Sequence, residues 1–558
     1  MAGMNYAGIL GTESMQPSVF PFVWSMVLNR LGSIILYDHF ICEEMSKDNQ
    51  STIHDCIFYG GQDPEKNAIE SPGCRPLTYR AFRGMIHSTV AMLNTKGFHR
   101  NDRLAIIAPA GPETAVCITA VMAGFTSLPL NPHSTKKEFL EIFTRLGIRA
   151  IIVRRDFTTM AISVANDCDI PVIELVPVTN TAGIFTLEPE SPKECGEPEY
   201  ACPQDLAHVL LTSGTTAKSK VVPITQKQLS LSRKRSGHFQ RLTSDDRCLH
   251  IVPYYHGMGI GTALLSPLFA GGTVICTRDF IPSDFFSLLT TFRPTFYTAG
   301  PAIQRGILRE LKKVPASLLK DHSLRYIRSG SGFLPEDTRR DLESILNVPV
   351  IDAYSMSETG TVAINIPPRK GSVGIPFVES IRIIDESGQD LQPTMAGEII
   401  IRDAAVFPGY ENAPDENAVV FINGWFRTGD LGYLDSDGYL FLIGRKKELI
   451  NKGGEKIAPS EIDAALMSCP GVSEAMAFPI HDPVLGEDIA AMVVRKQKDL
   501  SEADLRRSLL DNLTYSKLPR YIFFVNSIPK TPSGKPMRYG GTQWYFRKKE
   551  EDQMPKVV

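Results

Sequence analysis

A regular alternation of apolar strands and amphipathic helices constrains the fold more than any other feature of this sequence. Segment 77–97 has the apolar spacing of a helix that ends at Gly97, and segment 102–132 follows as strand, helix and strand. Short apolar runs at 150–153 and 171–175 are typical of buried strands. Strands that alternate with helices usually pair in parallel and are covered on both faces, so we predict an α/β fold with layered, mainly parallel sheets.

Composition points to a globular protein that acts on a small molecule. The chain has 558 residues, with 59 Lys and Arg against 62 Asp and Glu, and this balance gives no electrostatic footprint for nucleic acid. Ten cysteines occur without a CxxC pair, which argues against zinc and against a disulfide framework. We therefore expect reduced thiols, a cytoplasmic location and a small anionic ligand.

The first part of the chain contains one apolar stretch. Asn29 and Arg30 interrupt the apolar run at 19–36, and no basic segment precedes it, so a transmembrane helix is not expected. A helix docked on the body of the protein is the prediction for this N-terminal extension. Reversible membrane contact is the less favoured alternative. The last three residues do not form a peroxisomal SKL-type ending.

A polar loop between apolar runs is a candidate phosphate site. We predict that 177–205 is a solvated connection rich in Pro and Glu, and that 207–211 is a buried strand leading into the loop. Such loops present backbone N–H groups and hydroxyls to anions. Ser219 and Val221 replace the second glycine and the magnesium-binding hydroxyl of a Walker loop, so the loop is of another type. The candidate phosphate ligands are Thr212, Ser213, Gly214, Thr215, Thr216 and Lys220.

The string TSGTTAKSK resembles the phosphate loop of the adenylate-forming superfamily, whose pattern is TSGTTGxPKG, with Ala217, Ser219 and Val221 as departures. Three later segments support the resemblance, which is closest to the acyl-CoA synthetases. YSMSE is similar to the family's YGxTE, GWFRTGDLGYL begins a block that carries the family's aspartate and hinge, and PKTPSGK is similar to PKTxxGK. Together they cover about residues 52–540.

The resemblance implies a nucleotide and thiol site. The SGSG segment at 329–332 resembles the family's adenine-side loop. Tyr354 is expected to stack on adenine, and Asp430, on a loop after the strand with Phe426, to accept hydrogen bonds from the ribose hydroxyls. Glu358 is the expected Mg²⁺ ligand, with Thr216 beside it. Besides the phosphate loop, the expected ATP and coenzyme A contacts are Gly330, Ser331, Gly332, Asp352, Ala353, Tyr354, Ser355, Met356, Ser357, Asp430, Arg445, Gly453, Gly454 and Lys535.

Catalysis is assigned by the same resemblance. Lys535 is the expected adenylation lysine, with Thr212, Lys220 and His256 as the other catalytic candidates. The segment PYYHGMGIG contains no acidic residue to pair with an ammonium group, which argues against an α-amino acid substrate. The candidate acid pocket is formed by His256, Gly257, Ala299, Gly300, Gly330 and Ser331.

These expectations define a reaction and a domain plan. A carboxylic acid, fatty or smaller, is predicted to attack MgATP and form an acyl-adenylate with release of pyrophosphate, after which coenzyme A takes the acyl group. The predicted domains are an extension at 1–51, an adenylation domain at 52–446, a mobile α+β lid at 447–540 that rotates about Lys447, and a tail at 541–558. Within the lid, Ser460 is predicted to open a helix.

Three alternatives stay open at this point. The acyl group is transferred to an acyl or peptidyl carrier protein, the departures in the loop mark a degenerate nucleotide-binding protein, or a luciferase-type oxidation follows adenylation. The motif residues Glu358, Asp430, Arg445 and Lys535 are intact, which disfavours a degenerate protein.

Overall fold

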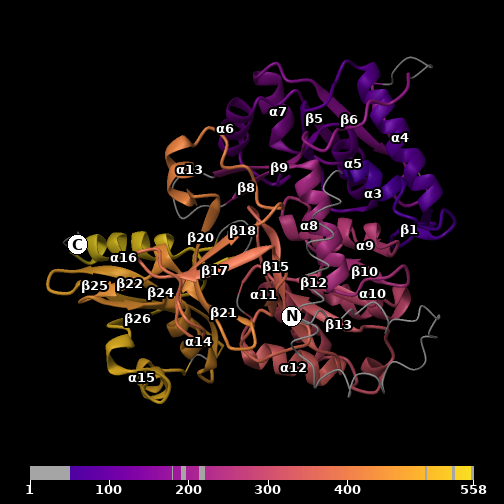
Figure 1. The fold of residues 1–558 in the computed structure, drawn as a ribbon. Coiled ribbons are helices and arrows are strands. Elements are labelled where there is room, and N and C mark those ends of the chain that lie inside the picture. The colour runs from indigo at the N-terminus through magenta and orange to yellow at the C-terminus, as the bar shows by residue number, and fades with distance from the viewer. Residues whose placement is uncertain are drawn as a thin grey trace, which may run out of the picture.

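Four sheets organise the chain, as Figure 1 shows in a computed structural model. The structure describes residues 51–178, 180–189, 196–212, 220–332, 334–496, 499–530 and 535–553. The apolar run at 19–36 therefore lies outside the described residues. Among the helices within these ranges, none combines the length and apolar character needed to cross a membrane.

The first sheet contains the predicted alternation of strands and helices. Its order is β7-β6-β5-β3-β4-β8-β9, parallel from β6 to β8 and antiparallel at both edges. The strands are β3 (Arg103–Ile107), β4 (Thr126–Pro129), β5 (Ala150–Arg154), β6 (Val172–Pro177), β7 (Phe185–Glu188), β8 (Leu206–Thr212) and β9 (Lys220–Thr225). The helices are α3 (Ile53–Phe58), α4 (Tyr79–Thr95), α5 (Pro112–Gly124), α6 (Lys136–Leu146), α7 (Met160–Asp167) and α8 (Gln226–Phe239).

Strand β7 corrects one expectation. The segment 177–205 was predicted to be a solvated connection throughout, but Phe185 and Leu187 are buried and alternate with the exposed Thr186. This two-residue period places one apolar face on the core, so the segment pairs with β6 as an antiparallel edge strand.

The second sheet has the order β16-β15-β14-β13-β12-β10-β11-β1-β2, with parallel pairing from β1 to β14. Its strands are β1 (Asn67–Glu70), β2 (Leu77–Thr78), β10 (Arg247–His250), β11 (Thr273–Cys276), β12 (Phe296–Ala299), β13 (Tyr326–Ser329), β14 (Val350–Met356), β15 (Gly360–Ile364) and β16 (Ile375–Pro376). Its helices are the π-helix η3 (Met258–Leu265), α9 (Ser266–Phe269), α10 (Phe285–Phe292), α11 (Pro301–Leu311) and α12 (Glu336–Leu346). Short 3-10 turns η4 (Pro282–Asp284) and η5 (Leu318–Lys320) connect them.

One hydrophobic core joins the two large sheets. It contains Ile69 of β1, Val274 of β11 and Leu104 of β3, together with α5, all thirteen residues of which are buried. Helix α5 is apolar on every side, which suits a helix enclosed by protein and not one at the surface. The sheets are therefore fixed relative to each other, and the loops at their strand ends keep a constant geometry.

A third sheet follows, with the order β17-β18-β20-β19 and β21 paired to β20. Its elements are β17 (Ser380–Ile384), β18 (Gly397–Arg402), α13 (Pro414–Val420), β19 (Phe421–Ile422), β20 (Trp425–Leu434) and β21 (Leu440–Arg445). The 3-10 turn η6 (Lys446–Glu448) then leads to the C-terminal domain, shown in yellow in Figure 1.

The C-terminal domain is the predicted small α+β unit. Its sheet has the order β23-β22-β25-β24, antiparallel, with β26 parallel to β25. The elements are β22 (Ile450–Lys452), β23 (Glu455–Ile457), α14 (Pro459–Ser468), β24 (Val472–Asp482), β25 (Gly486–Arg495), α15 (Glu502–Leu510), the 3-10 turn η7 (Tyr515–Lys517), β26 (Tyr521–Phe524) and α16 (Arg538–Gln553). The parallel sheets followed by this domain confirm the predicted fold class.

Helix α16 crosses the predicted boundary between domain and tail. Its Trp544 and Tyr545 pack against the apolar cluster that contains Met476 and Phe478 of β24. A Cβ atom at Gly541 would lie 2.8 Å from the Met476 side chain, so the helix lies very close to the sheet. Residues of the predicted tail up to 553 are therefore helical, while the predicted domain limits themselves stay predictions.

Candidate active site

The predicted phosphate loop connects two antiparallel strands of the first sheet. Thr212, at the end of β8, is directly opposite Lys220, at the start of β9. The intervening candidates Ser213, Gly214, Thr215 and Thr216 lie outside the described residues. The two strands hold the ends of the loop next to each other. A ligand of the loop must therefore lie past the ends of β8 and β9, on the side where the loop connects them.

Lys220 and Glu358 lie around one aromatic ring. The Lys220 Nζ atom is 4.2 Å from the centre of the Tyr410 ring, and the Tyr410 hydroxyl donates a 2.7 Å hydrogen bond to Glu358 Oε1. Burial lowers the pKa of Lys220, and the positive charge of Lys447 lowers it further. The predicted phosphate lysine and the predicted metal ligand are thus brought together by a tyrosine that the sequence did not indicate.

A second group connects the second and third sheets. The Tyr354 hydroxyl donates a 2.6 Å hydrogen bond to Asp430 Oδ2, and Arg445 Nε lies 2.9 Å from Asp430 Oδ1. Burial raises the pKa of the Asp430 carboxyl, against the opposing effect of Arg445. Three residues predicted to hold the nucleoside therefore form one polar cluster before any ligand is present.

The sequence suggested that Asp430 lies on a loop, but the structure places it in a strand. It is part of the ten-residue strand β20 and is opposite Arg445 of β21. Phe426, Thr428 and Asp430 alternate inward along this strand, and this alternation keeps the segment extended through the TGD motif. The strand pairing fixes the Asp430 side chain more firmly than a loop would.

Lys535 of the C-terminal domain reaches this cluster. Burial and the Arg445 guanidinium lower the pKa of Lys535, while the carboxylates of Asp430 and Glu358 act in the opposite direction. Lys535 nevertheless retains solvent-exposed surface. The predicted adenylation lysine is thus within electrostatic range of the predicted ribose and metal ligands.

His256 is also within electrostatic range of Lys535. Burial lowers the pKa of His256 to about 4, and the Lys535 ammonium group contributes to this shift. The centre of the imidazole ring is 4.6 Å from that of the Tyr255 ring, and His256 lies two residues before the first residue of the π-helix η3. At neutral pH His256 is therefore uncharged, so it can meet a substrate as a hydrogen-bonding group without adding a second positive charge.

Glycine residues form much of the predicted acid pocket. A Cβ atom at Gly257 would be 3.3 Å from Leu210, and one at Gly330 would be 3.2 Å from Met258 Sδ. A Cβ atom at Gly300 would lie 3.7 Å from the Gly330 carbonyl oxygen, and the buried Ala299 precedes Gly300. Because these positions lack side chains, the backbone itself lies at the predicted pocket, which permits either a chain or a small acid.

Ser331 has an unusual backbone conformation. Its φ angle is +64°, a left-handed value that non-glycine residues seldom adopt, and its side chain is exposed next to Gly332. Such conformations occur often at ligand sites, where surrounding structure imposes them. The left-handed residue Ser331 thus lies in the predicted adenine-side loop, between Gly330 and the start of α12.

Other predicted contacts have partners within the protein. Asp352 forms an ion pair with Arg339 of α12, and burial raises the pKa of its carboxyl. Met356 Sδ lies 3.6 Å from the Tyr354 hydroxyl oxygen, whose proton is donated to Asp430, and Ala353, Ser355 and Ser357 belong to the same segment. Gly453 and Gly454 form the β22–β23 turn, with positive φ angles of 60° and 93°.

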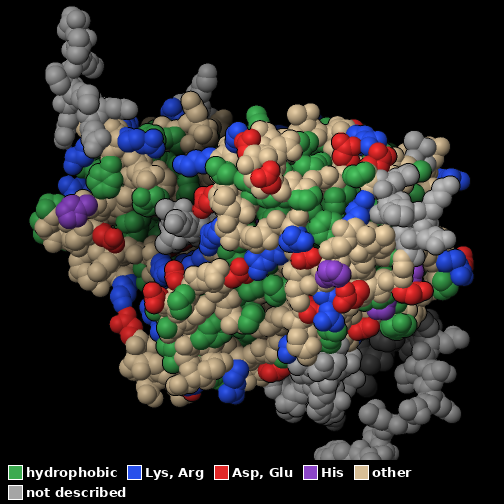
Figure 2. Space-filling view, turned by 90° about the horizontal axis from the view of Figure 1, so that it is seen from above, with side chains coloured by type: hydrophobic (Ala, Val, Ile, Leu, Met, Phe, Trp, Pro, Cys, Tyr) green, Lys and Arg blue, Asp and Glu red, His purple; other side chains and the backbone are tan. Residues whose placement is uncertain are grey.

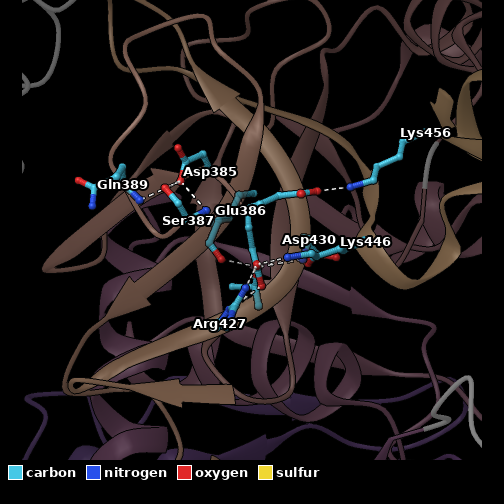
Figure 3. Close-up of polar contacts among 11 residues, drawn as sticks. Asp385, Glu386, Ser387, Gln389, Arg427, Asp430, Lys446 and Lys456 are labelled. Atoms are coloured by element: carbon cyan, nitrogen blue, oxygen red, sulfur yellow. Dashed lines mark hydrogen bonds and ion pairs between the residues drawn. The ribbon is translucent and has the colours of Figure 1, made fainter. Parts of the chain in front are cut away.

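Contacts across the predicted hinge hold the C-terminal domain against the third sheet. Figure 3 shows Glu386, in the turn after β17, directed at Lys456 of β23, and both Arg427 and Lys446 directed at one carboxylate, which is Glu398 of β18. Lys446 is therefore anchored to the third sheet, whereas the next residue, Lys447, is exposed. Lys447, the predicted hinge residue, is therefore at the surface directly after this anchored position.

Helix α14 differs from the expectation in one detail. Ser460 was predicted to open the helix, but its N-cap is Ala458, which makes no side-chain cap. The Ser460 hydroxyl instead donates a 2.8 Å hydrogen bond to the Ile443 carbonyl of β21. The serine thus adds a contact between the domains where sequence indicated a helix cap.

Several functional candidates were missed from sequence. Tyr410 follows an unremarkable Pro-Gly pair, and nothing near it predicts that it joins Lys220 to Glu358. Arg233 and Arg328 are buried near the acid pocket, at 4% and 1% exposure. Arg328 immediately precedes the SGSG segment of the predicted adenine-side loop. This position next to a predicted site was the only sequence signal for Arg328.

Comparison with known proteins identifies the family. The model of the AMP-binding enzyme family matches residues 60–411, and that of the AMP-binding enzyme C-terminal domain matches residues 461–535. The chain belongs to the AMP-binding enzyme family. The predicted resemblance to adenylate-forming enzymes is therefore confirmed, and the carboxyl end of the match falls at Lys535.

Curated relatives and solved structures agree with this family. An oxalate–CoA ligase of Arabidopsis thaliana is 33% identical over 87% of this chain and 96% of the relative. A sulfoacetate–CoA ligase of Cupriavidus necator is 31% identical over 86% and 94%, respectively. The structure of o-succinylbenzoate coenzyme A synthetase from Bacillus subtilis with ATP and magnesium has a TM-score of 0.76 and 25% identity, over 88% of this chain and 99% of that one.

Proposed function

We propose that this protein is an AMP-forming acid–CoA ligase. It activates a carboxylic acid with ATP, releases pyrophosphate and transfers the acyl group to coenzyme A. The observation that supports this proposal most is that the charges of Arg445, Asp430 and Glu358 act on the pKa of Lys535, a residue of the C-terminal domain. The family match and the CoA-ligase relatives support the same reaction and favour coenzyme A over a carrier protein.

The first step makes the acid reactive. A carboxylate oxygen attacks the α-phosphorus of ATP, and the bond to pyrophosphate breaks, which leaves a mixed anhydride of the acid with AMP. Lys535 neutralises charge that develops between the carboxylate and the α-phosphate, and the neutral His256 offers a hydrogen bond without competing for that charge. Thr212 and Lys220 hold the phosphates beyond the β8–β9 hairpin.

The nucleoside is held by the Tyr354, Asp430 and Arg445 cluster. The Asp430 carboxylate accepts hydrogen bonds from the ribose hydroxyls, and Arg445 keeps that carboxylate oriented. The stacking of adenine on Tyr354 is part of this proposal. Because the cluster is formed by strand pairing and a hydrogen bond, it is ordered before ATP arrives and binding requires little rearrangement.

Magnesium fits the donor set on the phosphate side. Glu358 Oε1 accepts the Tyr410 hydrogen bond, and within the described residues its second oxygen, Oε2, has no hydrogen-bond partner. One hard carboxylate oxygen suffices for Mg²⁺ when phosphate oxygens and waters complete the octahedron. When bound, the ion neutralises the phosphates; Glu358, together with Thr216 as predicted, positions it.

The second step requires a change of domain position. We propose that the C-terminal domain rotates about Lys447, withdraws Lys535 and brings the Gly453–Gly454 turn to the cleft, where it borders coenzyme A. The thiolate of coenzyme A then attacks the acyl carbonyl carbon, the bond to the AMP oxygen breaks, and AMP leaves.

ATP–pyrophosphate exchange with a panel of carboxylic acids tests this function. At least one simple acid should support exchange, and the twenty standard amino acids should not, because the acid pocket offers no carboxylate for an ammonium group. Addition of coenzyme A should then yield an acyl-CoA with equal amounts of AMP and pyrophosphate. Exchange that depends only on free α-amino acids would contradict the proposal.

A further inference from the structure

Two buried arginines lie behind the acid pocket. Arg328, at the end of β13, donates a 2.8 Å hydrogen bond from Nη1 to Thr262 of η3, and its Nη2 is 3.4 Å from Ser355 Oγ. Arg233, on α8, donates from Nη2 to Ser232 Oγ at 2.6 Å. The Nε atoms of both arginines are buried without a hydrogen-bond partner.

Neither arginine has a carboxylate partner among the residues that the structure describes. Arg235, two positions after Arg233 on the same helix, shows the usual arrangement, because its Nη1 lies 2.7 Å from the buried Asp403 Oδ2. Burial lowers the pKa of Arg233 to about 9 and that of Arg328 to about 10, and the Arg328 charge adds to the shift of Arg233. Both side chains are still charged at neutral pH, and buried charges without a counter-ion are strongly disfavoured.

The pair is tightly enclosed by backbone. A Cβ atom at Gly261 would lie 2.4 Å from Arg233 Nη1, and one at Gly360 would lie 2.5 Å from Arg233 Nη2. Glycines at these two positions allow the guanidinium group to lie directly on the backbone of η3 and β15. The backbone of η3 and β15 is therefore built around this side chain, and η3 begins directly after the pocket residue Gly257.

The pair also adjoins the cleft. Ser355, the neighbour of Arg328 Nη2, is exposed and belongs to the segment between Tyr354 and Glu358 that contributes to the proposed active site. Thr262, the other neighbour of Arg328, lies one turn along η3 from Met258, which touches Gly330. An anion beyond Ser355 would thus lie next to the Arg328 guanidinium group, whose charge also acts on Arg233.

We propose that Arg233 and Arg328 bind the second anionic group of a short dicarboxylic acid whose first carboxylate is adenylated. This inference rests on the proposed acid–CoA ligase function and adds the class of acid. A carboxylate provides the counter-charge that the pair lacks, and its two oxygens match the paired donors of a guanidinium group. The Ser355 hydroxyl is an additional donor at the entrance.

The first test uses the unmodified enzyme. Oxalate, malonate, succinate and glutarate are compared in ATP–pyrophosphate exchange with the monomethyl ester of each, which keeps the reacting carboxylate and removes the second charge. For the best diacid we expect a kcat/KM at least about tenfold above that of its ester, because the ester leaves two buried cations without a partner. An ester that matches or exceeds every diacid would overturn the inference.

The second test assigns the preference to the arginine pair. Arg328→Gln and Arg233→Gln should each bring the ratio of diacid to ester towards one, and Arg328→Lys should retain part of it. Arg293→Gln, which removes an exposed arginine that pairs with Asp321, is the control and should leave the ratio unchanged. A well-folded Arg328→Gln variant with the wild-type ratio would move the anion site elsewhere.

The two levels of the proposal fail in different ways. If no acid, charged or esterified, supports exchange, the ligase function itself is wrong. If monocarboxylic acids or half-esters are the good substrates, the ligase function stands and only the second anion site is wrong. Protection against thermal unfolding by succinate but not by monomethyl succinate gives a check that does not depend on turnover.

Discussion

The nucleotide side and the acid side of the cleft use charge in opposite ways. On the nucleotide side, Asp430 is paired with Arg445 and Tyr354, and Glu358 with Tyr410. On the acid side, Arg233 and Arg328 are buried without a carboxylate in the described part of the chain. The first side is complete before its ligand binds, and the second lacks a counter-charge that we assign to the substrate.

Specificity for the acid substrate therefore lies on the acid side of the site. A nucleotide shared by a whole family is met by preformed pairs on strands, which need no adjustment between substrates. The acid differs between family members. In this protein we assign its recognition to the buried Arg233 on α8 and Arg328 on β13.

Lys535 links the two sides, so its loss should be most severe. Lys535→Ala should lower the rate of adenylate formation by about 10²- to 10³-fold, as expected for the removal of one preorganised charge from a reaction centre. Thioester formation from chemically prepared acyl-AMP should remain largely intact. Both half-reactions are measured separately, with Lys530→Ala, a lysine paired with Glu474 near the same terminal segment, as the control.

Replacement of Lys447 by proline should give the reverse pattern. A fixed φ at this exposed position restricts rotation of the C-terminal domain, while the arrangement seen here, with Lys535 at the cleft, is preserved. Thioester formation should therefore be slowed more than adenylation. Equal loss of both steps in both folded variants would contradict domain alternation.

Asp430 tests the preformed nucleotide side. Asp430→Asn should weaken ATP binding by about 1 to 3 kcal/mol, because the ribose hydroxyls lose a charged acceptor and Arg445 loses its partner. Isothermal titration with ATP measures this change. The preference between diacid and ester should stay as in wild type, and a change in that preference would show that the two sides are not separate.

Acidification should affect the acid side through its buried histidines. Burial lowers the pKa to about 3 for His208 and about 4 for His250 and His256, against about 6.5 in an unfolded chain. Below pH 6.5 the unfolded state binds protons that the native state does not, so stability falls as pH falls towards 4. Each histidine contributes about 1.4 kcal/mol per pH unit in that window.

Thermal unfolding between pH 7 and 4.5 measures this loss. His256→Asn should make the decline shallower, whereas His481→Asn, at an exposed position, should leave it unchanged. A stability that is flat across the window would show that these three imidazoles are not held neutral.

The domain contact in Figure 3 should have the smallest effect. Glu386 and Lys456 are both largely exposed, so their ion pair is weakened by solvent and salt. Lys456→Ala should favour thioester formation over adenylation by a few-fold at most, and the shift should vanish at high salt. An effect that persists in 1 M salt would indicate a role for Lys456 other than this pair.

Much of the nucleotide side could be predicted from sequence. Tyr354, Asp430, Arg445 and Lys535 stand in contiguous motifs, and the structure brings them into one cluster. The position of Asp430 within β20 was missed, because TGD has the composition of a turn while strand pairing with β21 decides its conformation. Ser213, Gly214, Thr215 and Thr216 remain predictions, since they lie outside the described residues.

The acid side could not be predicted in the same way. Helix α8 has a polar composition typical of a solvent-facing helix, yet ten of its fourteen residues are buried. Only tertiary packing against η3 and β15 encloses Arg233, and only strand order places Arg328 behind Ser355. Figure 2 shows mixed positive and negative side chains over the surface, in keeping with the balanced composition that gave no hint of a buried cationic pair.

The fate of the carboxylate oxygen tests the central claim most directly. With an acid labelled by ¹⁸O in its carboxylate, attack on the α-phosphorus of ATP and later departure of AMP must carry one labelled oxygen into AMP. Mass spectrometry of the nucleotide after turnover with coenzyme A measures this transfer. We predict AMP with one ¹⁸O atom; label in inorganic phosphate together with ADP, or unlabelled AMP alongside acyl-CoA, would contradict an acyl-adenylate intermediate.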